Sequence, residues 1–174
     1  MSSPTASSPA SQRRSKTVIG VLASCGIAVS LMQTLVVPLL PEFPRLLRTT
    51  PANAAWLVTA TLVAGAVCAP VLGRLGDMYG KRRMLLVSLA AMAVGSAIGA
   101  VSDDFAAVLV GRVLQGAAIG VVPLGISIMR DELPEERITS GVALMSATLG
   151  IGGAVGLPVT GLVAENLNWH WLFA

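Results

Sequence analysis

Long apolar runs separated by short polar segments make up most of the chain. A helix that crosses a bilayer needs about 20 apolar residues at a rise of about 1.5 Å each. Five runs come close to that length with no acidic residue inside them: 18–37, 54–72, 84–101, 105–129 and 139–164. After the fifth, "ENLNWHWLFA" carries polar residues and two tryptophans, which are typical of a membrane interface, and then turns apolar again. The pattern predicts an all-α polytopic transmembrane bundle with five complete spans and the start of a sixth.

Composition excludes a water-soluble domain. Hydrophobic residues make up 54% of the chain and charged residues 12%, and the mean hydropathy is +0.77. So few charged groups cannot cover a surface that faces water. The opening stretch, "MSSPTASSPASQRRSK", is rich in Ser, Pro and Ala. It predicts a disordered cytoplasmic tail at 1–16, followed by a membrane bundle at 17–174.

Basic residues cluster on one side of the predicted spans. Those in the tail and in the second-to-third and fourth-to-fifth connections are Arg13, Arg14, Lys16, Arg74, Lys81, Arg82, Arg83, Arg130 and Arg137. The opposite connections, at 41–53, 102–104 and 165–170, carry only Arg45 and Arg48. The positive-inside rule therefore predicts a multi-pass protein of the cell membrane with a cytoplasmic N-terminus. We expect no nucleic-acid partner, because these cations lie in short clusters rather than across one face.

Arg112 is the one cation inside a predicted span, roughly 12 Å below the outer surface. An arginine at such a place costs about 2.5–3.5 kcal/mol on insertion scales, so we expect it to face the bundle interior beside a polar partner. Gln115, three residues later, shares its helix face. Snorkelling of the Arg112 side chain to the outer interface is the open alternative. In the first span Gln33 is the only strongly polar residue, and its amide can hydrogen-bond a substrate but cannot carry a proton.

Three short motifs carry a resemblance to a known family. Between the second and third spans, "GRLGDMYGKRR" sets one carboxylate among three glycines and four cations. This segment resembles the signature loop of the major facilitator superfamily. The positions of that signature are filled by Gly73, Asp77, Gly80, Lys81 and Arg82. Met78 stands where the family usually has an arginine.

The fourth and fifth spans carry the other two motifs. "LVGRVLQGAAIG" is similar to the helix-four motif of the family, and its matching residues are Arg112, Gln115 and Gly116. The resemblance implies that Arg112 takes part in proton coupling. "GIGGAVGLPVTG" resembles the helix-five motif of the antiporter branch, with Leu157 splitting the usual Gly-Pro pair; its matching residues are Gly152, Gly156, Pro158 and Gly161. This second match implies a hinge between inward-open and outward-open states, with a static kink as the alternative.

The segment "RDELPEER", between the fourth and fifth spans, completes the resemblance. Asp131 and Arg137 occupy the acidic and basic positions that the family often has there. With Asp77 and Lys81 on the same side, the resemblance implies a charge network that holds one conformation and breaks in the other. Exposed ion pairs contribute only about 0.2–1 kcal/mol each, so several must act together. The glutamates of the segment are expected on a solvated face: Glu132, Glu135 and Glu136.

The resemblance implies a secondary active transporter, closest to the drug:proton antiporter branch with fourteen helices. It implies drugs or other small organic molecules as substrates, protons as the coupling ion, and Gln33 as a candidate substrate-lining residue. Facilitator-type transporters consist of two six-helix halves, so the chain is interpreted as an N-terminal fragment that does not transport alone. Because the first span has no carboxylate, we expect the titrating acid to lie beyond Ala174.

Two other functions stay open on the residues alone. One is a facilitator of another branch that imports a sugar or metabolite. The other is a short membrane protein that acts by associating with partners. No catalytic set can be assembled around His170, the only histidine, so neither enzyme activity nor a cofactor or metal site is expected.

Overall fold

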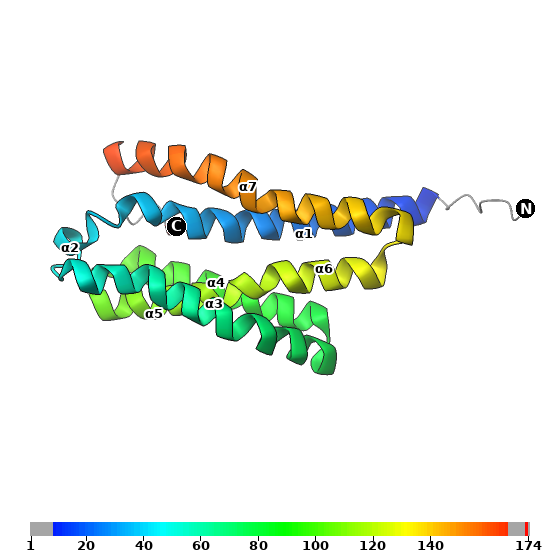
Figure 1. Cartoon of the computed structure of the whole chain (residues 1–174), viewed down its shortest axis with the longest axis horizontal. Coiled ribbons are helices and arrows are strands. Elements are labelled where there is room, and N and C mark those ends of the chain that lie inside the picture. The colour runs from blue at the N-terminus through cyan, green and yellow to red at the C-terminus, as the bar shows by residue number, and fades with distance from the viewer. Residues whose placement is uncertain (1–8, 167–172, 174) are drawn as a thin grey trace, which may run out of the picture.

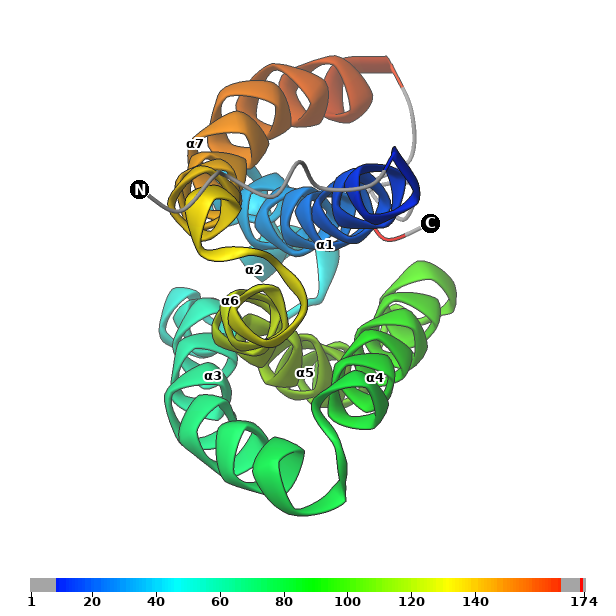
Figure 2. The same ribbon diagram turned by 90° about the vertical axis from the view of Figure 1, so that its right-hand side faces the viewer.

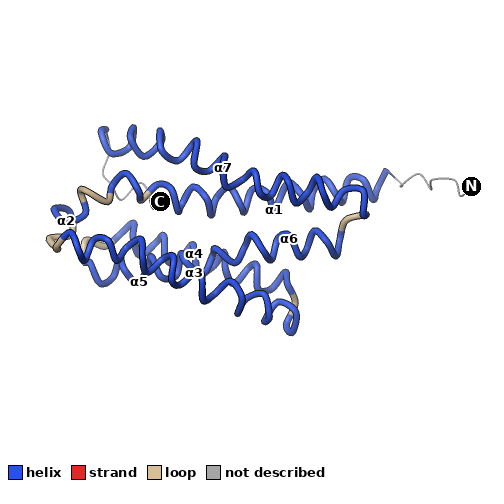
Figure 3. Tube along the Cα trace, in the orientation of Figure 1, coloured by secondary structure: helices blue, strands red, loops and turns tan. Residues whose placement is uncertain are grey.

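The computed structural model describes residues 9–166 and Phe173, and nearly all of these residues are helical. The helices follow the chain in the order α1 (Pro9–Leu35), η1 (Val37–Leu39), α2 (Phe43–Leu46), α3 (Pro51–Tyr79), α4 (Lys81–Val101), α5 (Phe105–Ala117), η2 (Ala118–Gly120), α6 (Val121–Glu132) and α7 (Glu135–Asn166). The residues that the structure describes contain no strand, and short loops join the helices (Figure 3). The predicted all-α class is confirmed.

Five helical segments are long and apolar enough to cross a membrane, as the sequence predicted. Their bounds are Ser15–Leu39, Pro51–Tyr79, Lys81–Val101, Phe105–Glu132 and Glu135–Leu162. The fourth span consists of α5 and α6, joined by the 3-10 turn η2. The helices extend beyond the predicted apolar runs, because the polar residues that flank these runs are also helical. Residues 167–172 lie outside the described ranges, so the start of a sixth span stays a prediction.

The predicted tail differs from the structure in its second half. α1 begins at Pro9, so residues 9–16 are helical where the sequence predicted disorder. Ala, Gln, Arg and Lys in this stretch have high helix propensity and extend α1 toward the N-terminus. The hydroxyl of Thr17 also donates to the carbonyl oxygen of Arg13 within the same helix (3.1 Å). The rest of the predicted tail, residues 1–8, lies outside the described residues.

Two spans begin at capping residues that the sequence supplies. Thr50 Oγ1 accepts a hydrogen bond from the backbone N–H of Asn53 (3.2 Å), and Pro51 opens α3 without an N–H to satisfy. At the start of α5, Asp104 Oδ2 accepts from the N–H of Ala107 (2.9 Å). These caps fix where both helices begin, at the end of the bundle opposite the chain's N-terminus (Figure 1).

Successive spans run in opposite directions. Figure 1 shows the N-terminal end of α1, the α3–α4 turn and the α6–α7 connection at one end of the bundle, and the α1–α3 and α4–α5 connections at the other. The clusters of cations therefore share one end of the molecule. We call it the basic end; its cations include Lys16, Lys81, Arg82, Arg83 and Arg130.

The turn between α3 and α4 is a single residue. α3 runs to Tyr79 and α4 starts at Lys81, so the predicted loop at 73–83 is mostly helix. Gly80 has a φ of +102°, a conformation that a side chain disfavours, while its N–H still donates to the carbonyl oxygen of Gly76 (2.9 Å). The sharp turn sets the first cations of α4 beside the last turn of α3.

The spans pack in two groups with α6 between them. Viewed along the bundle in Figure 2, α1 lies beside α7, and α3, α5 and α4 lie together on the other side of α6. Glycines let backbones approach: a methyl group at Gly95 would overlap the carbonyl oxygen of Gly111, and one at Gly116 would overlap that of Thr61. Small residues at helix contacts are typical of packing in lipid. Here they draw α3, α4 and α5 together around the interior face of α5.

Candidate functional site

Arg112 lies in the interior of the bundle. Arg112 is only 2% exposed to solvent. One guanidinium nitrogen, Nη1, donates to Gln115 Oε1 (2.6 Å) and to the carbonyl oxygen of Met32 (3.5 Å), and Nε donates to that of Leu57 (3.3 Å). The snorkelling alternative is therefore wrong for this structure, and the predicted partner Gln115 is in place. The side chain ties α5 to α1 and α3.

Gln115 extends this network to α4. Its amide nitrogen Nε2 donates to Ser96 Oγ (3.0 Å) and to the sulfur of Met32 (3.7 Å), and the Ser96 hydroxyl donates to the same sulfur (3.4 Å). Sequence reasoning missed Ser96 and Met32. The available signal for Ser96 was a hydroxyl in the middle of the apolar run 84–101. Nothing in the sequence pointed to Met32, because its carbonyl oxygen and sulfur accept hydrogen bonds only when α1 is packed against α5.

The acceptors around Arg112 are all neutral. They are one side-chain amide and two backbone carbonyls, and no carboxylate whose side chain the structure describes forms an ion pair with the guanidinium. An arginine keeps its charge in proteins, so the centre of the bundle holds a positive charge without a countercharge. Such a charge is expensive to bury and is retained in membrane segments mainly where function needs it.

Gly116, the third predicted residue of this motif, has a packing role in the structure. It is buried, and a methyl group there would meet both the carbonyl oxygen of Thr61 and the side chain of Ala64. The close contact between α5 and α3 positions Leu57, one turn earlier on α3, against the Arg112 side chain. The glycine thus sets the distance at which Arg112 meets α3.

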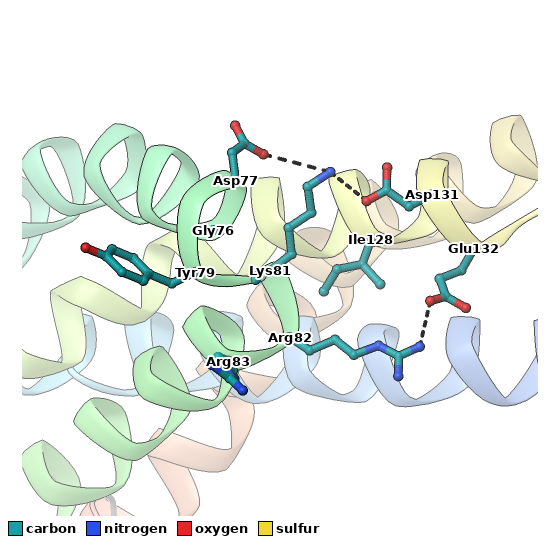
Figure 4. Close-up of a pocket in the computed structure, with 10 residues that line it drawn as sticks. Gly76, Asp77, Tyr79, Lys81, Arg82, Arg83, Ile128, Asp131 and Glu132 are labelled. Atoms are coloured by element: carbon teal, nitrogen blue, oxygen red, sulfur yellow. Dashed lines mark hydrogen bonds and ion pairs between the residues drawn. The ribbon is translucent and has the colours of Figure 1, made fainter.

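A second group of charges lies at the basic end. Figure 4 shows Lys81 reaching between Asp77 and Asp131, with its Nζ 2.6 Å from Asp131 Oδ2 and 3.9 Å from Asp77 Oδ1. The Asp77 side chain is 72% exposed, against 23% for Lys81. These groups border an open pocket of about 550 Å³, which is also lined by Tyr79 and Arg83. Lys81 therefore binds Asp131 closely and leaves Asp77 open to solvent.

Two members of the charge network need comment. Arg137 sits in the first turn of α7 and forms no ion pair within the described part of the chain, so its place in the network stays a prediction. Glu132, expected on a solvated face, instead pairs with Arg82 Nη2 at 2.6 Å and is 23% exposed at its side chain. Consecutive residues at the end of α6 thus bind consecutive residues at the start of α4.

The three glycines of the signature segment have different surroundings in the structure. Gly73 has open space where a side chain would be, so its packing does not require glycine. Gly76 is buried against Leu124 of α6, and Gly80 makes the turn. Gly76 lies in the segment but is not one of the positions matched to the family signature. Its contact with Leu124 depends on how α3 packs on α6.

α7 is one continuous helix that carries Pro158 in its interior. A methyl group at Gly152 would overlap the Ser30 hydroxyl, and Gly156 lies against Thr34 in the same way. Gly161, by contrast, faces open space. The two glycines are therefore contact points with α1, and a hinge at Pro158 stays a prediction.

Hydroxyl groups also connect α1 and α7. Ser30 Oγ donates to the carbonyl oxygen of Leu149 (2.9 Å), and Thr160 Oγ1 donates to that of Leu35 (3.1 Å). Interhelical hydrogen bonds of this kind contribute about 0.6 kcal/mol each on average. They connect the last turns of α1 to the middle and the second half of α7.

Gln33 lines a cavity of about 280 Å³ between α1, α3, α6 and α7. It is half-buried, and no residue in the described ranges accepts from or donates to its amide. The remaining lining residues are Val29, Ser30, Thr34, Leu62, Ile119, Val122 and Leu149. Gln33 thus borders a mostly aliphatic space, and its role as a substrate-lining residue stays a prediction.

The fold and these groups define a polytopic helical membrane protein with an interior cation and a charged end. The family model of the Major Facilitator Superfamily matches residues 22–174. The chain therefore belongs to this superfamily of membrane transporters, and the predicted membership is confirmed.

Similar proteins include drug exporters. The Multidrug export protein EmrB of Haemophilus influenzae is 31% identical over 123 residues, which cover 70% of this chain and 24% of that protein. The Tetracenomycin C resistance and export protein of Streptomyces glaucescens is 31% identical over 146 residues, which cover 83% of this chain and 27% of that protein. The chain spans about a quarter of the length of these curated relatives. Their similarity agrees with the resemblance to the drug:proton antiporter branch.

A solved structure agrees with the fold. The human organic anion transporter MFSD10 superposes with a TM-score of 0.73 at 23% identity, over 96% of this chain and 45% of that one. At this identity the likeness supports the arrangement of the helices.

Proposed function

We propose that the chain supplies the first helices of an exporter that moves small organic molecules across the cell membrane in exchange for protons. The single observation that carries the proposal is the interior charge of Arg112, which is held by neutral acceptors only. The similarity to a multidrug export protein and to a tetracenomycin C export protein supports the direction of transport. The basic end faces the cytoplasm in this proposal, as the positive-inside rule indicates.

Proton coupling follows from the field of the Arg112 guanidinium. A positive charge in a low-dielectric interior stabilises the ionised form of any carboxylic acid brought near it. Such a carboxylate can exchange a proton with water on one side of the membrane. On the other side it can give up its contact with the substrate. No acid in the described spans lies in contact with Arg112, so this proposal places the exchanging acid elsewhere in the full transporter.

Alternating access needs contacts that form in one state and break in the other. The ion pairs at the basic end suit this role, because they are partly exposed and individually weak. Asp77 is the member left open, since Lys81 lies nearer to Asp131. In this proposal Asp77 binds a part of the transporter that approaches the basic end when the inner side closes.

α7 supplies the moving contact with α1. Its proline removes one backbone hydrogen bond inside the helix, and its glycines let it pack closely on Ser30 and Thr34. A helix with these features bends at a defined place. We therefore place the hinge of this part of the transporter at Pro158.

Efflux measurements test the proposal. The complete reading frame that contains this chain is expressed in a bacterial strain without major drug pumps, and cells are loaded with a panel that includes neutral Nile red and cationic ethidium. We expect efflux of at least one dye above empty-vector cells, abolished by a protonophore. Efflux that a protonophore leaves unchanged would remove proton coupling, and accumulation in place of efflux would make the protein an importer. Absence of any transport at confirmed membrane abundance would overturn the transporter proposal for this chain.

A further inference from the structure

The cavity beside Gln33 has a lining chemistry that restricts what it can bind. Five of its residues are aliphatic: Val29, Leu62, Ile119, Val122 and Leu149. The polar members are one amide and two hydroxyls, from Gln33, Ser30 and Thr34. None of the lining residues is ionisable or aromatic. The cavity therefore offers apolar surface and hydrogen bonds, and it offers neither a countercharge nor an aromatic face.

The hydrogen-bonding capacity of the lining is partly committed. Ser30 Oγ donates to the carbonyl oxygen of Leu149 (2.9 Å), and Thr34 Oγ1 donates to that of Ser30 (2.9 Å). Both hydroxyls have thus used their hydrogens and can only accept. The Gln33 amide is the available donor: within the described ranges it has no partner, and it can give two hydrogens and accept through its oxygen. A ligand that both donates and accepts matches this set.

Electrostatics disfavour a cation in the cavity. A cation in a transporter interior needs a carboxylate or an aromatic ring to replace its lost hydration, and the lining supplies neither. The nearest interior charge is Arg112, whose guanidinium binds the carbonyl of Met32, the residue directly before Gln33. Two positive charges repel each other, and in a low-dielectric interior this repulsion is strong. A permanently charged drug would meet an unfavourable site.

An anion would be attracted by the charge of Arg112, but it would gain no direct contact with the guanidinium. Arg112 does not line the cavity and is 2% exposed, and its Nε and Nη1 groups already donate to Gln115 and two carbonyls. In this conformation it therefore forms no hydrogen bond with a ligand beside Gln33. The amide of Gln33 alone does not compensate for the desolvation of a carboxylate.

We infer that this cavity selects uncharged, lipophilic molecules that carry both a hydrogen-bond donor and an acceptor. The inference rests on the proposed function, since it names the substrate class of the same transporter. It differs from the expectation for exporters of cationic dyes, because the cavity has no group that pairs with a cation. Gln33 is the specificity-determining residue.

Equilibrium binding tests the inference without requiring transport. The purified protein in nanodiscs of zwitterionic lipid is titrated with three dansyl probes: neutral dansylamidoethanol, cationic dansylamidoethyl-trimethylammonium and anionic dansylglycine. Binding is read from the increase in dansyl emission, after subtraction of empty nanodiscs. We expect the neutral probe to bind at least about tenfold more tightly than either charged probe, given the cost of an unpaired charge in this environment.

Substitutions at Gln33 make the result specific to the cavity. Gln33→Glu introduces a carboxylate and should shift the preference toward the cationic probe, while Gln33→Leu should weaken the neutral probe and leave the cationic probe unchanged. Ser140→Glu, at an exposed position of α7 away from the cavity, adds the same charge and should change neither. All variants are compared at equal monodispersity.

Tighter binding of the cationic or the anionic probe by the unmodified protein would overturn the inference. So would equal binding of all three probes, or a Gln33→Glu variant whose preference matches that of Ser140→Glu. A protein that shows the expected binding preference but no efflux would refute the proposed function and keep the inference. Efflux of ethidium but of no uncharged dye that carries both a hydrogen-bond donor and an acceptor would keep the proposed function and refute the inference.

Discussion

The basic end and the bundle interior both hold cations, and the two regions stabilise them differently. At the basic end, Lys81 and Arg82 pair with the carboxylates of Asp131 and Glu132 in reach of water. In the interior, Arg112 pairs with no carboxylate that the structure describes and is held by an amide and two carbonyls. Water already stabilises the charges at the end, so each pair adds little. Without water, the interior site depends on every one of its acceptors.

Flexibility follows the same division. Weak and redundant pairs suit contacts that must break during a transport cycle. A cation with fixed neutral acceptors suits a position that keeps its charge in place while other groups move around it. The comparison predicts large effects for changes at the interior site and small, salt-sensitive effects for changes at the basic end.

The largest effect is expected for Arg112→Lys. Lysine keeps the charge but replaces the planar guanidinium, so the contacts with Met32, Leu57 and Gln115 cannot all be kept. Loss of one or two hydrogen bonds to a charged group, at about 1.5–3 kcal/mol each, corresponds to efflux slowed about tenfold to a hundredfold or more. Initial efflux rates at matched membrane abundance measure this. Arg82→Lys, at the basic end, serves as the control and should remain near the unmodified rate; equal losses in both variants would contradict the comparison.

A large loss of stability is expected for Gly116→Ala. The added methyl group would overlap the carbonyl oxygen of Thr61, so α5 and α3 must separate. Overpacking of this kind costs about 1–3 kcal/mol and should lower the midpoint of thermal unfolding in detergent. Gly73→Ala is the matched control, because nothing lies within 4 Å of the new methyl group. An unfolding midpoint that is the same in both variants would show that the close approach of α5 to α3 is not needed.

A moderate effect is expected for Ser96→Ala. The change removes the hydroxyl that accepts from Gln115 Nε2 (3.0 Å) and donates to the Met32 sulfur. Interhelical hydrogen bonds in membranes contribute about 0.6 kcal/mol on average, so the unfolding midpoint should fall slightly. Efflux should fall more than stability does, because Gln115 positions Arg112. Ser24→Ala, which removes an exposed hydroxyl bonded only within α1, is the control for the loss of a hydroxyl. A Ser96→Ala variant with unchanged efflux would limit the positioning network to Gln115.

A smaller effect is expected for Asp131→Asn and Glu132→Gln, alone or together. Each removes one partly exposed ion pair, worth about 0.2–1 kcal/mol, from the contact between α4 and α6. Thermal unfolding at low and high salt separates this contribution, since salt should reduce the difference between these variants and the unmodified protein. Glu135→Gln, on α7, should have no effect. A loss that persists at high salt would mean that these pairs are stronger than their exposure indicates.

The smallest effect on stability is expected for Asp77→Asn. Its carboxylate is 72% exposed and lies 3.9 Å from Lys81 Nζ, so folding and insertion should be unchanged. Efflux should nevertheless be slower, because the variant lacks the carboxylate that we propose to bind when the inner side closes. Membrane abundance and efflux rate are measured on the same cells. An unchanged rate at equal abundance would remove Asp77 from the mechanism.

The sequence predicted the spans more accurately than the loops. The apolar runs placed all five spans, whereas the segment 73–83, read as a loop, is helix on both sides of Gly80. Glycines and charges suggested a break because both are common between helices. Gly73 and Gly76 continue α3 all the same, since their backbone hydrogen bonds are made within the helix and Gly76 also packs on Leu124.

For the candidate sites, the sequence predicted partners only within a single helix. Arg112 and Gln115 could be paired because they lie on one helix at a spacing of three residues. The partners on other helices could not be, since they depend on how the helices rotate and tilt against one another. The same reason explains why Glu132 was left out of the charge network.

Sequence alone determined that this chain forms membrane-spanning helices, that its cations gather at alternate connections and that Arg112 requires an interior partner. These properties follow from the transfer free energies of the residues themselves, which add along the chain. Tertiary structure decided which groups meet: Met32 and Ser96 at the interior site, Asp131 and Glu132 at the basic end, and the uncharged lining beside Gln33. These contacts depend on glycine-mediated approach of helices far apart in sequence, which no local pattern specifies.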